Sequence, residues 1–392
     1  MDRLPKTSVC MEGRRYLLLV VAILALALAF EQNLLLAIGV MLAATALVSW
    51  RTGAKMLDRV SAARTSPRSV QAGQPFSVAV RLSNRHGRLA SWAVYVEDGL
   101  ASEEPPHDLA TRTRVFFPRV AAGGSQVEVY RTRVARRGLY RLGPLKVSTR
   151  FPFGLFRRTV TFDVPDRLVV TPRLGRLVPG WTVRHEAAAL GHRHRRLHGP
   201  GRVTGEFFGV REWRSGDSRR WIHWRSSARH GDLVVRVFDR PRNRHLALLV
   251  DLWQPEQPHS DDADRVEQIV SFAATIVADA CRRGNVHLSL GMAGSEAAWV
   301  AGPTSLPLRD RAMERLALVR ASRDGALSEL IRQAQRRIKP DSEVVLITTR
   351  RIGGMESELG LDPASRDGRS LLRRLRTISA AEDEISQYFE LP

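Results

Sequence analysis

The chain has 392 residues, enough for two or three domains of ordinary size, and 44% of its residues are hydrophobic, as expected of a folded protein. Its formal net charge of +21 favours anionic partners such as nucleic acid, anionic lipid or an acidic protein. The two cysteines, Cys10 and Cys281, exclude a disulfide framework and a CxxC metal knuckle, and so indicate a reducing compartment.

Two apolar runs without charged residues, 16–30 and 34–50, lie near the start of the chain on either side of a polar turn. At 1.5 Å per residue they span roughly 23 and 26 Å, a little less than the ~30 Å hydrocarbon core of a bilayer. Lysines and arginines flank the two outer ends but not the turn, which favours a cytoplasmic location for both ends. We therefore predict a cytoplasmic tail over residues 1–15 and a transmembrane helical hairpin over residues 16–50. A cleaved signal peptide and a buried core hairpin are the alternatives, and the second apolar run argues against the first of them.

Residues 66–175 carry a different pattern, in which short segments alternate apolar and polar side chains, as in PFSVAVRLSN and SQVEVYRTRV. Turn-like breaks such as AAGG and RRG separate these segments. Short strands at regular spacing with turns between them predict a β-sandwich. The segment holds no constellation typical of catalysis, so we expect a spacer or docking module.

Residues 241–392 predict an α/β domain. RHLALLVDLW, NVHLSLGMAG and SEVVLITT have the pattern of buried strands, DADRVEQIVSFAATIVADACRRG has the spacing of a helix, and SLLRRLRTI predicts a late helix. Strands that alternate with helices indicate a largely parallel sheet covered on both faces. Ligands of such sheets bind beyond the carboxyl ends of the strands. The sequence there has no glycine-rich phosphate loop, so no cofactor is expected.

Between these two domains, residues 176–240 hold a basic loop followed by the stretch REWRSGDSRRWIHWRSSARHGDL, Arg211 to Leu233. Asp217 is a suitable cap for a short helix that begins near Ser218. The side chains that would then share one helical face, suited to packing, are those of Trp221, Trp224 and Ala228. The loop over residues 192–202 is predicted to be a solvated contact loop, because its histidines are irregularly spaced for a metal.

The stretch GEFFGVREWRSGDSRRWIHWRSSARHGDLVVRVF resembles the signature of the bacterial domain of unknown function 58 family. The upstream segment RRGLYRLGPLKVSTRFPFGLFRR, Arg136 to Arg158, also resembles that family, including its PFGLF turn. Phe151 stands where the family is expected to have an aspartate. The residues that match the motif, predicted to act as an internal brace or as a partner-docking face, are Arg211, Gly216, Asp217, Arg219 (or Arg220), Ile222, Trp224, Ala228 and Arg229.

The resemblance implies a membrane-anchored bacterial protein. Together with the two apolar runs and their flanking cations, it predicts a multi-pass protein of the bacterial inner (cytoplasmic) membrane whose soluble domains face the cytoplasm. It also implies that residues 241–392 form a von Willebrand A-like, Rossmann-type domain, and that the protein works with a MoxR-type AAA+ ATPase in protein maturation or complex assembly. Domains of the von Willebrand A type often bind a metal through a DxSxS segment after the first strand. Here the segment 251–255 keeps only the aspartate, so no metal is predicted.

These observations together predict a non-enzymatic scaffold or adaptor, with two alternatives. Arginines interleaved with tryptophans suit a basic module that binds nucleic acid or anionic lipid. Asp217 and His223 suit the acid and base of an uncharacterised hydrolase. A capping role accounts for Asp217, however, and no Ser/His/Asp or Cys/His set is evident in the sequence, so no catalytic residue is predicted.

Overall fold

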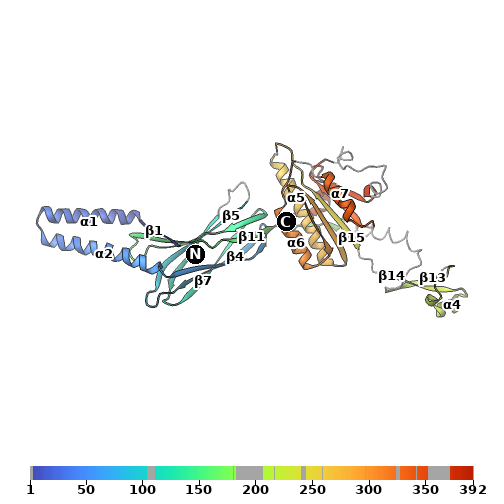
Figure 1. The fold of residues 1–392 in the computed structure, drawn as a ribbon, viewed down its shortest axis with the longest axis horizontal. Coiled ribbons are helices and arrows are strands. Elements are labelled where there is room, and N and C mark those ends of the chain that lie inside the picture. The colour runs from blue at the N-terminus through green and yellow to red at the C-terminus, as the bar shows by residue number, and fades with distance from the viewer. Residues whose placement is uncertain are drawn as a thin grey trace. The chain divides into compact units, whose positions relative to one another are not determined.

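The computed structural model describes residues 3–103, 111–179, 181, 206–215, 217–239, 244–257, 259–295, 297–323, 327–340, 342–351 and 371–391. The chain divides into two compact units, Met1–Arg173 and Leu174–Pro392. Figure 1 shows the elements of each unit.

Two antiparallel helices, α1 (Met11–Ala29) and α2 (Asn33–Leu57), lie side by side in the first unit (Figure 1). Among the described helices, α2 is long and apolar enough to cross a membrane. The first turns of α1 carry charges, so its uncharged part, residues 16–29, is shorter than the ~20 residues of a typical span. Both helices continue beyond the predicted hairpin into arginine- and lysine-bearing flanks, because these residues are good helix formers.

The two helices contact each other through small and polar side chains. The Tyr16 hydroxyl of α1 donates to the Leu42 carbonyl of α2 at 3.0 Å and lies 3.1 Å from the Thr45 hydroxyl. Gly39 lies so close to α1 that a Cβ atom there would stand 2.6 Å from Cδ2 of Leu24. Close approach at a glycine and hydrogen bonds between helices are the means by which apolar helices associate when hydrophobic burial cannot drive them together.

The rest of the first unit is built from two β-sheets. One is antiparallel with the order β2-β4-β7, formed by β2 (Val60–Thr65), β4 (Pro75–Asn84) and β7 (Ser125–Arg133). The other has the order β1-β10-β9-β5-β8-β11-β3, with β6 paired to β5. Its strands are β1 (Arg3–Val9), β3 (Ser69–Gln71), β5 (Ser91–Ser102), β6 (Thr111–Val120), β8 (Gly138–Leu142), β9 (Leu145–Thr149), β10 (Phe156–Phe162) and β11 (Asp166–Thr171).

The two sheets share a core, which gives this part of the chain the layered form of a β-sandwich. On β4 the buried side chains alternate with exposed ones, as the sequence pattern predicts, and Val80 and Leu82 are fully buried. They pack in one cluster with Val96 and Phe117 of the other sheet. Full burial of each such side chain stabilises the fold by roughly 1.5–3 kcal/mol, so the alternation alone supplies much of the driving force.

The first strand was not evident from the sequence, which assigns its residues to a tail. Residues 3–9 form β1, which pairs antiparallel with β10 from Arg3 opposite Phe162 to Val9 opposite Phe156. The segment RLPKTSV has little hydrophobic alternation of its own. Its strand conformation depends on the edge of β10, which offers unpaired backbone groups for hydrogen bonding.

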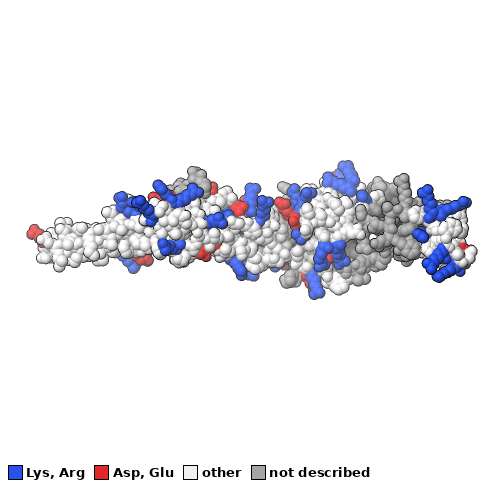
Figure 2. Space-filling view, turned by 90° about the horizontal axis from the view of Figure 1, so that it is seen from below, with Lys and Arg blue, Asp and Glu red and all other residues white. Residues whose placement is uncertain are grey.

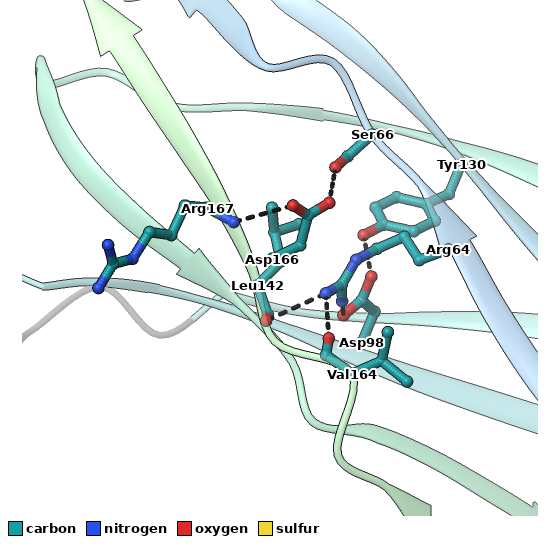
Figure 3. A network of polar contacts seen from close by, with 8 residues as sticks. All are labelled: Arg64, Ser66, Asp98, Tyr130, Leu142, Val164, Asp166 and Arg167. Carbon is teal, nitrogen blue, oxygen red and sulfur yellow. Dashed lines mark hydrogen bonds and ion pairs between the residues drawn. The ribbon is translucent and has the colours of Figure 1, made fainter. Parts of the chain in front are cut away.

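A buried ion pair joins the two sheets (Figure 3). The side chains of Arg64 on β2 and Asp98 on β5 are both 0% exposed and lie 2.6 Å apart. Nη2 of the guanidinium donates to the carbonyls of Leu142 and Val164, and the Tyr130 hydroxyl of β7 donates to Asp98 at 2.7 Å. Burial raises the pKa of the Asp98 carboxyl above its ordinary value of 3.8, against the hydrogen bonds from Tyr130 and Arg64, which lower it.

The second unit contains a five-stranded sheet with the order β17-β16-β15-β18-β19. The neighbours β15–β16, β15–β18 and β18–β19 are parallel, and β17 is an antiparallel edge strand. The strands are β15 (Arg244–Asp251), β16 (Val286–Ala293), β17 (Ala298–Pro303), β18 (Glu343–Thr348) and β19 (Leu375–Ser379). The helices are α5 (Ser260–Arg283), α6 (Leu306–Leu318) and α7 (Leu327–Arg337).

Helices cover both faces of this sheet, which confirms the mixed α/β content predicted for the C-terminal part of the chain. Leu248 and Val250 of β15 pack in one cluster with α5 and α6, whereas Ala247 and Leu249 pack in another with α7. The hydrophobic run of β15 follows from this arrangement, because both faces of the strand are buried.

The late helix predicted from SLLRRLRTI is wrong over most of its length. Residues 375–379 form β19, which runs parallel to β18, and Ile378 is buried. The helical spacing of the leucines was a local signal, and pairing with the free edge of β18 overrides it.

The remaining elements of this unit are short. The strands β13 (Glu206–Glu212) and β14 (Val234–Asp239) form an antiparallel pair, and between them lie the 3-10 helix η1 (Arg219–Trp221) and the helix α4 (Trp224–His230). Near the end of the chain, β20 (Phe389–Glu390) follows η2 (Glu384–Gln387) and pairs with β12 (Arg176–Leu177).

Candidate functional site

The motif predicted from the sequence folds as a strand pair closed by a short helical segment. Arg211 of β13 stands opposite Val235 of β14. The intervening chain returns to the second strand, because Trp213 N donates to the Leu233 carbonyl and His223 N to the Val234 carbonyl, each at 2.7 Å. A β-bridge between Ile222 and Val235 closes the loop. The side chains buried within this small module are those of Ile222, Ser227, Val234 and Val235.

Asp217 makes its principal contact with Arg211 and not with a helix. Two parallel hydrogen bonds of 2.6 and 2.7 Å join the guanidinium to the two carboxylate oxygens, and Arg214 N also donates to Asp217 at 2.9 Å. The hydrogen bonds from Arg211 hold the pKa of the Asp217 carboxyl below its ordinary value of 3.8, and the same pairing raises the pKa of Arg211. The pair fixes the turn that follows β13.

The helix cap predicted at Asp217 is therefore wrong. Cap and helix both lie further along the chain, where Nδ1 of His223 accepts a hydrogen bond from Ser226 N at 3.1 Å at the start of α4. Ser218, which precedes η1, makes no side-chain cap. Gly231, at φ +77°, ends α4. Because both carboxylate oxygens of Asp217 bind Arg211, Asp217 does not cap a helix.

The shared helical face predicted for Trp221, Trp224 and Ala228 is also absent from the described structure. The chain leaves the helical conformation at Ile222 and His223, so Trp221 belongs to η1 and Trp224 begins α4. Ala228 is exposed, and the Trp224 side chain is 67% exposed. The i, i+3 spacing assumed one continuous helix, which the extended backbone at Ile222 interrupts.

The surface of the motif module is strongly basic. Figure 2 shows the blue of basic side chains over the part that carries β13, β14 and α4 in Figure 1. Among the module's side chains that the structure describes, the exposed acidic ones are those of Glu212 and Asp232. The exposed arginines, which outnumber them, are Arg214, Arg219, Arg220, Arg225, Arg229 and Arg236. Of these, Arg219 and Arg229 match the motif, and Arg225 is a surface residue that the motif does not include.

The motif residues thus divide into an inner and an outer set. The inner set comprises Arg211, Asp217 and Ile222, which hold the loop together. The outer set comprises Arg219, Trp224, Ala228 and Arg229, which are exposed. The predicted Gly216 and the predicted contact loop over residues 192–202 lie outside the described residues.

A second polar cluster lies at the carboxyl edge of the parallel sheet. The Asp251 carboxylate, at the end of β15, accepts hydrogen bonds from the Thr348 hydroxyl at 2.8 Å and from Arg350 Nε at 3.0 Å. Asp251 is buried, and the guanidinium carbon of Arg350 lies 5.0 Å from the centre of the Trp253 ring. Arg350 of the same chain therefore pairs with Asp251, the aspartate at the start of the segment that was compared with DxSxS. Among the described residues, no group of three His, Cys, Asp or Glu side chains is placed to hold a metal ion.

The Asp251–Arg350 contact was missed at the sequence level, although a signal for it exists. The triplet TTR follows SEVVLI directly, and RHLALLVD ends in the aspartate. Neighbouring parallel strands end at the same edge of a sheet, so these residues meet if the two strands are adjacent. Strand order is not readable from the sequence, and here it is the pairing of β15 with β18 that brings them together.

Comparison with known proteins identifies the same region. The family described as Protein of unknown function DUF58 matches residues 209–319, which run from β13 to the end of α6. A curated relative, the uncharacterized protein YeaD of Bacillus subtilis (strain 168), is 26% identical over 196 residues. That match covers 48% of this chain and 45% of the relative, so the chain spans less than half of the relative's length.

Two solved structures are each similar to less than a third of this chain. A superoxide reductase (neelaredoxin) from Ignicoccus hospitalis is 17% identical with a TM-score of 0.20, covering 28% of this chain and 79% of that one. The CARDB domain of PF1109 from Pyrococcus furiosus is 9% identical with a TM-score of 0.20, covering 29% of this chain and 94% of that one. Likenesses at this score carry no argument about function.

Proposed function

We propose that this protein is a membrane-anchored, non-enzymatic scaffold or adaptor that displays the motif module to a cytoplasmic partner. By resemblance, the partner is a MoxR-type AAA+ ATPase that acts in protein maturation or complex assembly, and the α/β domain is of the von Willebrand A type. The match to DUF58 over residues 209–319 supports the family resemblance on which this assignment rests.

The division of the motif into an inner and an outer set carries the docking proposal. Asp217 and Arg211 hold the loop in one conformation, and Trp224 then projects with 67% of its side chain exposed. Tryptophan and arginine are the residues most enriched among those that dominate the energy of protein interfaces. A rigid loop with an exposed tryptophan among arginines therefore suits a partner with an apolar pocket and an acidic rim.

The connections of the helix pair support two membrane crossings. The chain enters α1 from β1 and leaves α2 toward β2, and both strands belong to the same β domain. If α2 crosses the bilayer, α1 must return across it, because both outer ends join one folded unit. The arginines at the start of α1 can extend their side chains to the interface, which compensates for the short uncharged part of α1. The cations at the outer ends favour the cytoplasm for the β domain.

The contacts of the hydrolase candidates favour structural roles. Nδ1 of His223 is engaged by Ser226 N, and both carboxylate oxygens of Asp217 are engaged by Arg211. A general base requires a free lone pair within reach of the proton that it takes. To act as a general base, His223 would have to release Ser226 N from Nδ1, and Asp217 would have to release Arg211.

A pull-down from detergent-solubilised membranes tests the docking role. The variants Trp224→Ala and Arg229→Ala are expected to lose an AAA+ ATPase that the unmodified protein retains. Arg282→Ala, an arginine of α5 with a 79% exposed side chain, is the matched control and should retain it. Retention of the ATPase by both motif variants, or failure of the unmodified chain to capture one, would contradict the proposal. Steeply salt-dependent retention of DNA or RNA would instead favour the nucleic-acid alternative.

A further inference from the structure

The PFGLF turn, residues 152–156, is not used by the docking proposal, and its position suggests a separate role. The turn joins β9 to β10 and lies against the domain ends of both helices. Cys10 N, just before α1, donates to the Leu155 carbonyl at 3.0 Å. A Cβ atom at Gly13 of α1 would overlap that same carbonyl oxygen, and one at Gly53 of α2 would stand 3.4 Å from the Phe151 carbonyl oxygen. The turn is therefore packed where the helices leave the β domain.

The position of α2 in a bilayer would set the depth of the turn that it touches. Trp50 ends the uncharged part of α2 and is exposed. Gly53 lies three residues further, roughly 4.5 Å along the helix axis. If α2 crosses a bilayer with Trp50 at the interface, the Phe151 carbonyl that adjoins Gly53 lies at the level of the lipid headgroups.

Aromatic side chains are exposed at this level. Phe153, at the tip of the turn, has 57% of its side chain exposed. The Phe151 ring stacks on Trp92 of β5, with 6.2 Å between ring centroids, and Trp92 is exposed as well. Trp92 and Phe151 thus form an aromatic pair beside the turn. Exposed aromatic rings next to a membrane span are characteristic of the interface between lipid and water.

Cations lie beside Trp92 and at the adjoining helix ends. The guanidinium carbon of Arg119 lies 5.0 Å from the centre of the Trp92 ring. The exposed cations at the helix ends, beside Trp92 and at the start of the turn are Arg14, Arg15, Arg51, Lys55, Arg119 and Arg150. Exposed acidic residues of the same helix ends are Glu12 and Asp58. Figure 2 shows the apolar helices in white and the cations in blue where the β domain begins.

We infer that this end of the β domain is a bilayer contact. Phe153 inserts at the boundary between headgroups and acyl chains, and the surrounding cations bind the headgroups of anionic lipids. Continuity with α2 and the excess of positive charge favour a lipid surface over a protein as the occupant. The inference rests on the membrane anchoring proposed above and adds that the turn, not only the helices, touches lipid.

Depth-dependent fluorescence quenching in vesicles tests the inference. The full chain, with Cys10→Ser and Cys281→Ser, receives one new cysteine labelled with a polarity-sensitive fluorophore. The three positions are Phe153→Cys at the turn, Met41→Cys in the middle of α2, and Gln74→Cys in an exposed turn at the opposite end of the β domain. Each labelled chain is reconstituted in phosphatidylcholine vesicles with and without phosphatidylglycerol, and lipids carry a quencher near the headgroup or deep in the acyl chain.

The label at Phe153→Cys is expected to be quenched several-fold more by the shallow quencher than the label at Gln74→Cys, and more strongly when phosphatidylglycerol is present. Deep quenching at Met41→Cys without shallow quenching at Phe153→Cys would overturn the inference and leave the anchor standing. Absence of quenching at both positions would overturn the anchor as well. Protection of the Phe153→Cys label from an aqueous quencher but not from lipid quenchers would show that protein covers the turn. Equal quenching with and without phosphatidylglycerol would overturn the role assigned to the cations.

Discussion

Two arginine–aspartate pairs show how environment decides what an ion pair does. Arg64 and Asp98 are enclosed between two sheets, where the loss of hydration opposes the charged forms. Arg211 and Asp217 lie at a partly exposed turn, where water screens their attraction. The same two residue types therefore lead to different expectations for mutation and for pH.

At the buried pair, Arg64→Met leaves the Asp98 carboxylate without its compensating charge. We expect the β domain to lose roughly 3–5 kcal/mol of unfolding free energy, because an uncompensated buried charge is strongly unfavourable. Hydrogen exchange of the β5 amides in the full chain measures the loss.

The double variant Arg64→Met with Asp98→Asn provides the control for this buried pair. It should be less destabilised than Arg64→Met alone, since the neutral amide can still accept the hydrogen bond from Tyr130 without a buried charge. If both variants exchange at the same rate, the buried charge is not the cause.

At the exposed pair of Arg211 and Asp217, we expect stability to depend on pH in the acid range. The pKa of Asp217 in the folded chain lies below its ordinary value of 3.8, so the stability that the pair contributes is fully present above pH 3.8 and is lost as the pH falls through the folded-state pKa. The contribution is about 1 kcal/mol or less, because the site is partly exposed. No change is expected between pH 5 and 8 on this account.

Cleavage by pepsin between Trp213 and Ser218 can measure this titration, because pepsin is active in the same acid range. The unmodified chain should become more sensitive below pH 3.8, beyond any change in protease activity. Asp217→Asn should be sensitive throughout and supplies the correction for the protease. A pH step of equal size in both chains would mean that another group titrates.

At the scale of elements, the cap of α4 separates the structural role of His223 from a catalytic one. His223→Ala removes the side-chain acceptor for Ser226 N and should destabilise the first turn of α4 by about 1 kcal/mol. Asn or Ser at the same position should restore most of the loss, because both are good cap residues. Hydrogen exchange of the α4 amides is the measurement. Loss of a chemical activity that neither replacement restores would argue for catalysis instead.

The helical segment between β13 and β14 also shows where local pattern fails. Trp221 and Trp224 have helical spacing, yet the backbone between them is extended, because Ile222 bridges to Val235. The residues of β19 also have helical spacing, yet they form an edge strand that pairs with β18. Short elements follow their neighbours more than their own propensity.

At the scale of the whole molecule, the helix pair and the β domain make one prediction about topology. The connecting turn should lie outside the cytoplasmic membrane and the β domain inside, because both outer helix ends join that domain and carry the flanking cations. The test uses cells that express the chain without its own cysteines, Cys10→Ser with Cys281→Ser. In this chain Glu31→Cys should react with an impermeant maleimide added outside the cells. Gln74→Cys should react only after permeabilisation. The reverse pattern, or release of the full-length chain into the soluble fraction, would contradict the proposed anchor.

The sequence by itself determined the order of the parts: an apolar helix pair, a β domain with alternating burial, a basic motif and an α/β domain. Those signals are local, because hydrophobic periodicity and turn residues act within one element. Only the tertiary structure decided that residues 3–9 complete a sheet, that His223 and not Asp217 caps α4, and that Arg350 lies on Asp251. Each of these depends on a partner far away in the chain or on competition between two nearby partners. The energy of such a contact depends on which segments meet in the folded chain. The local sequence pattern does not contain that information.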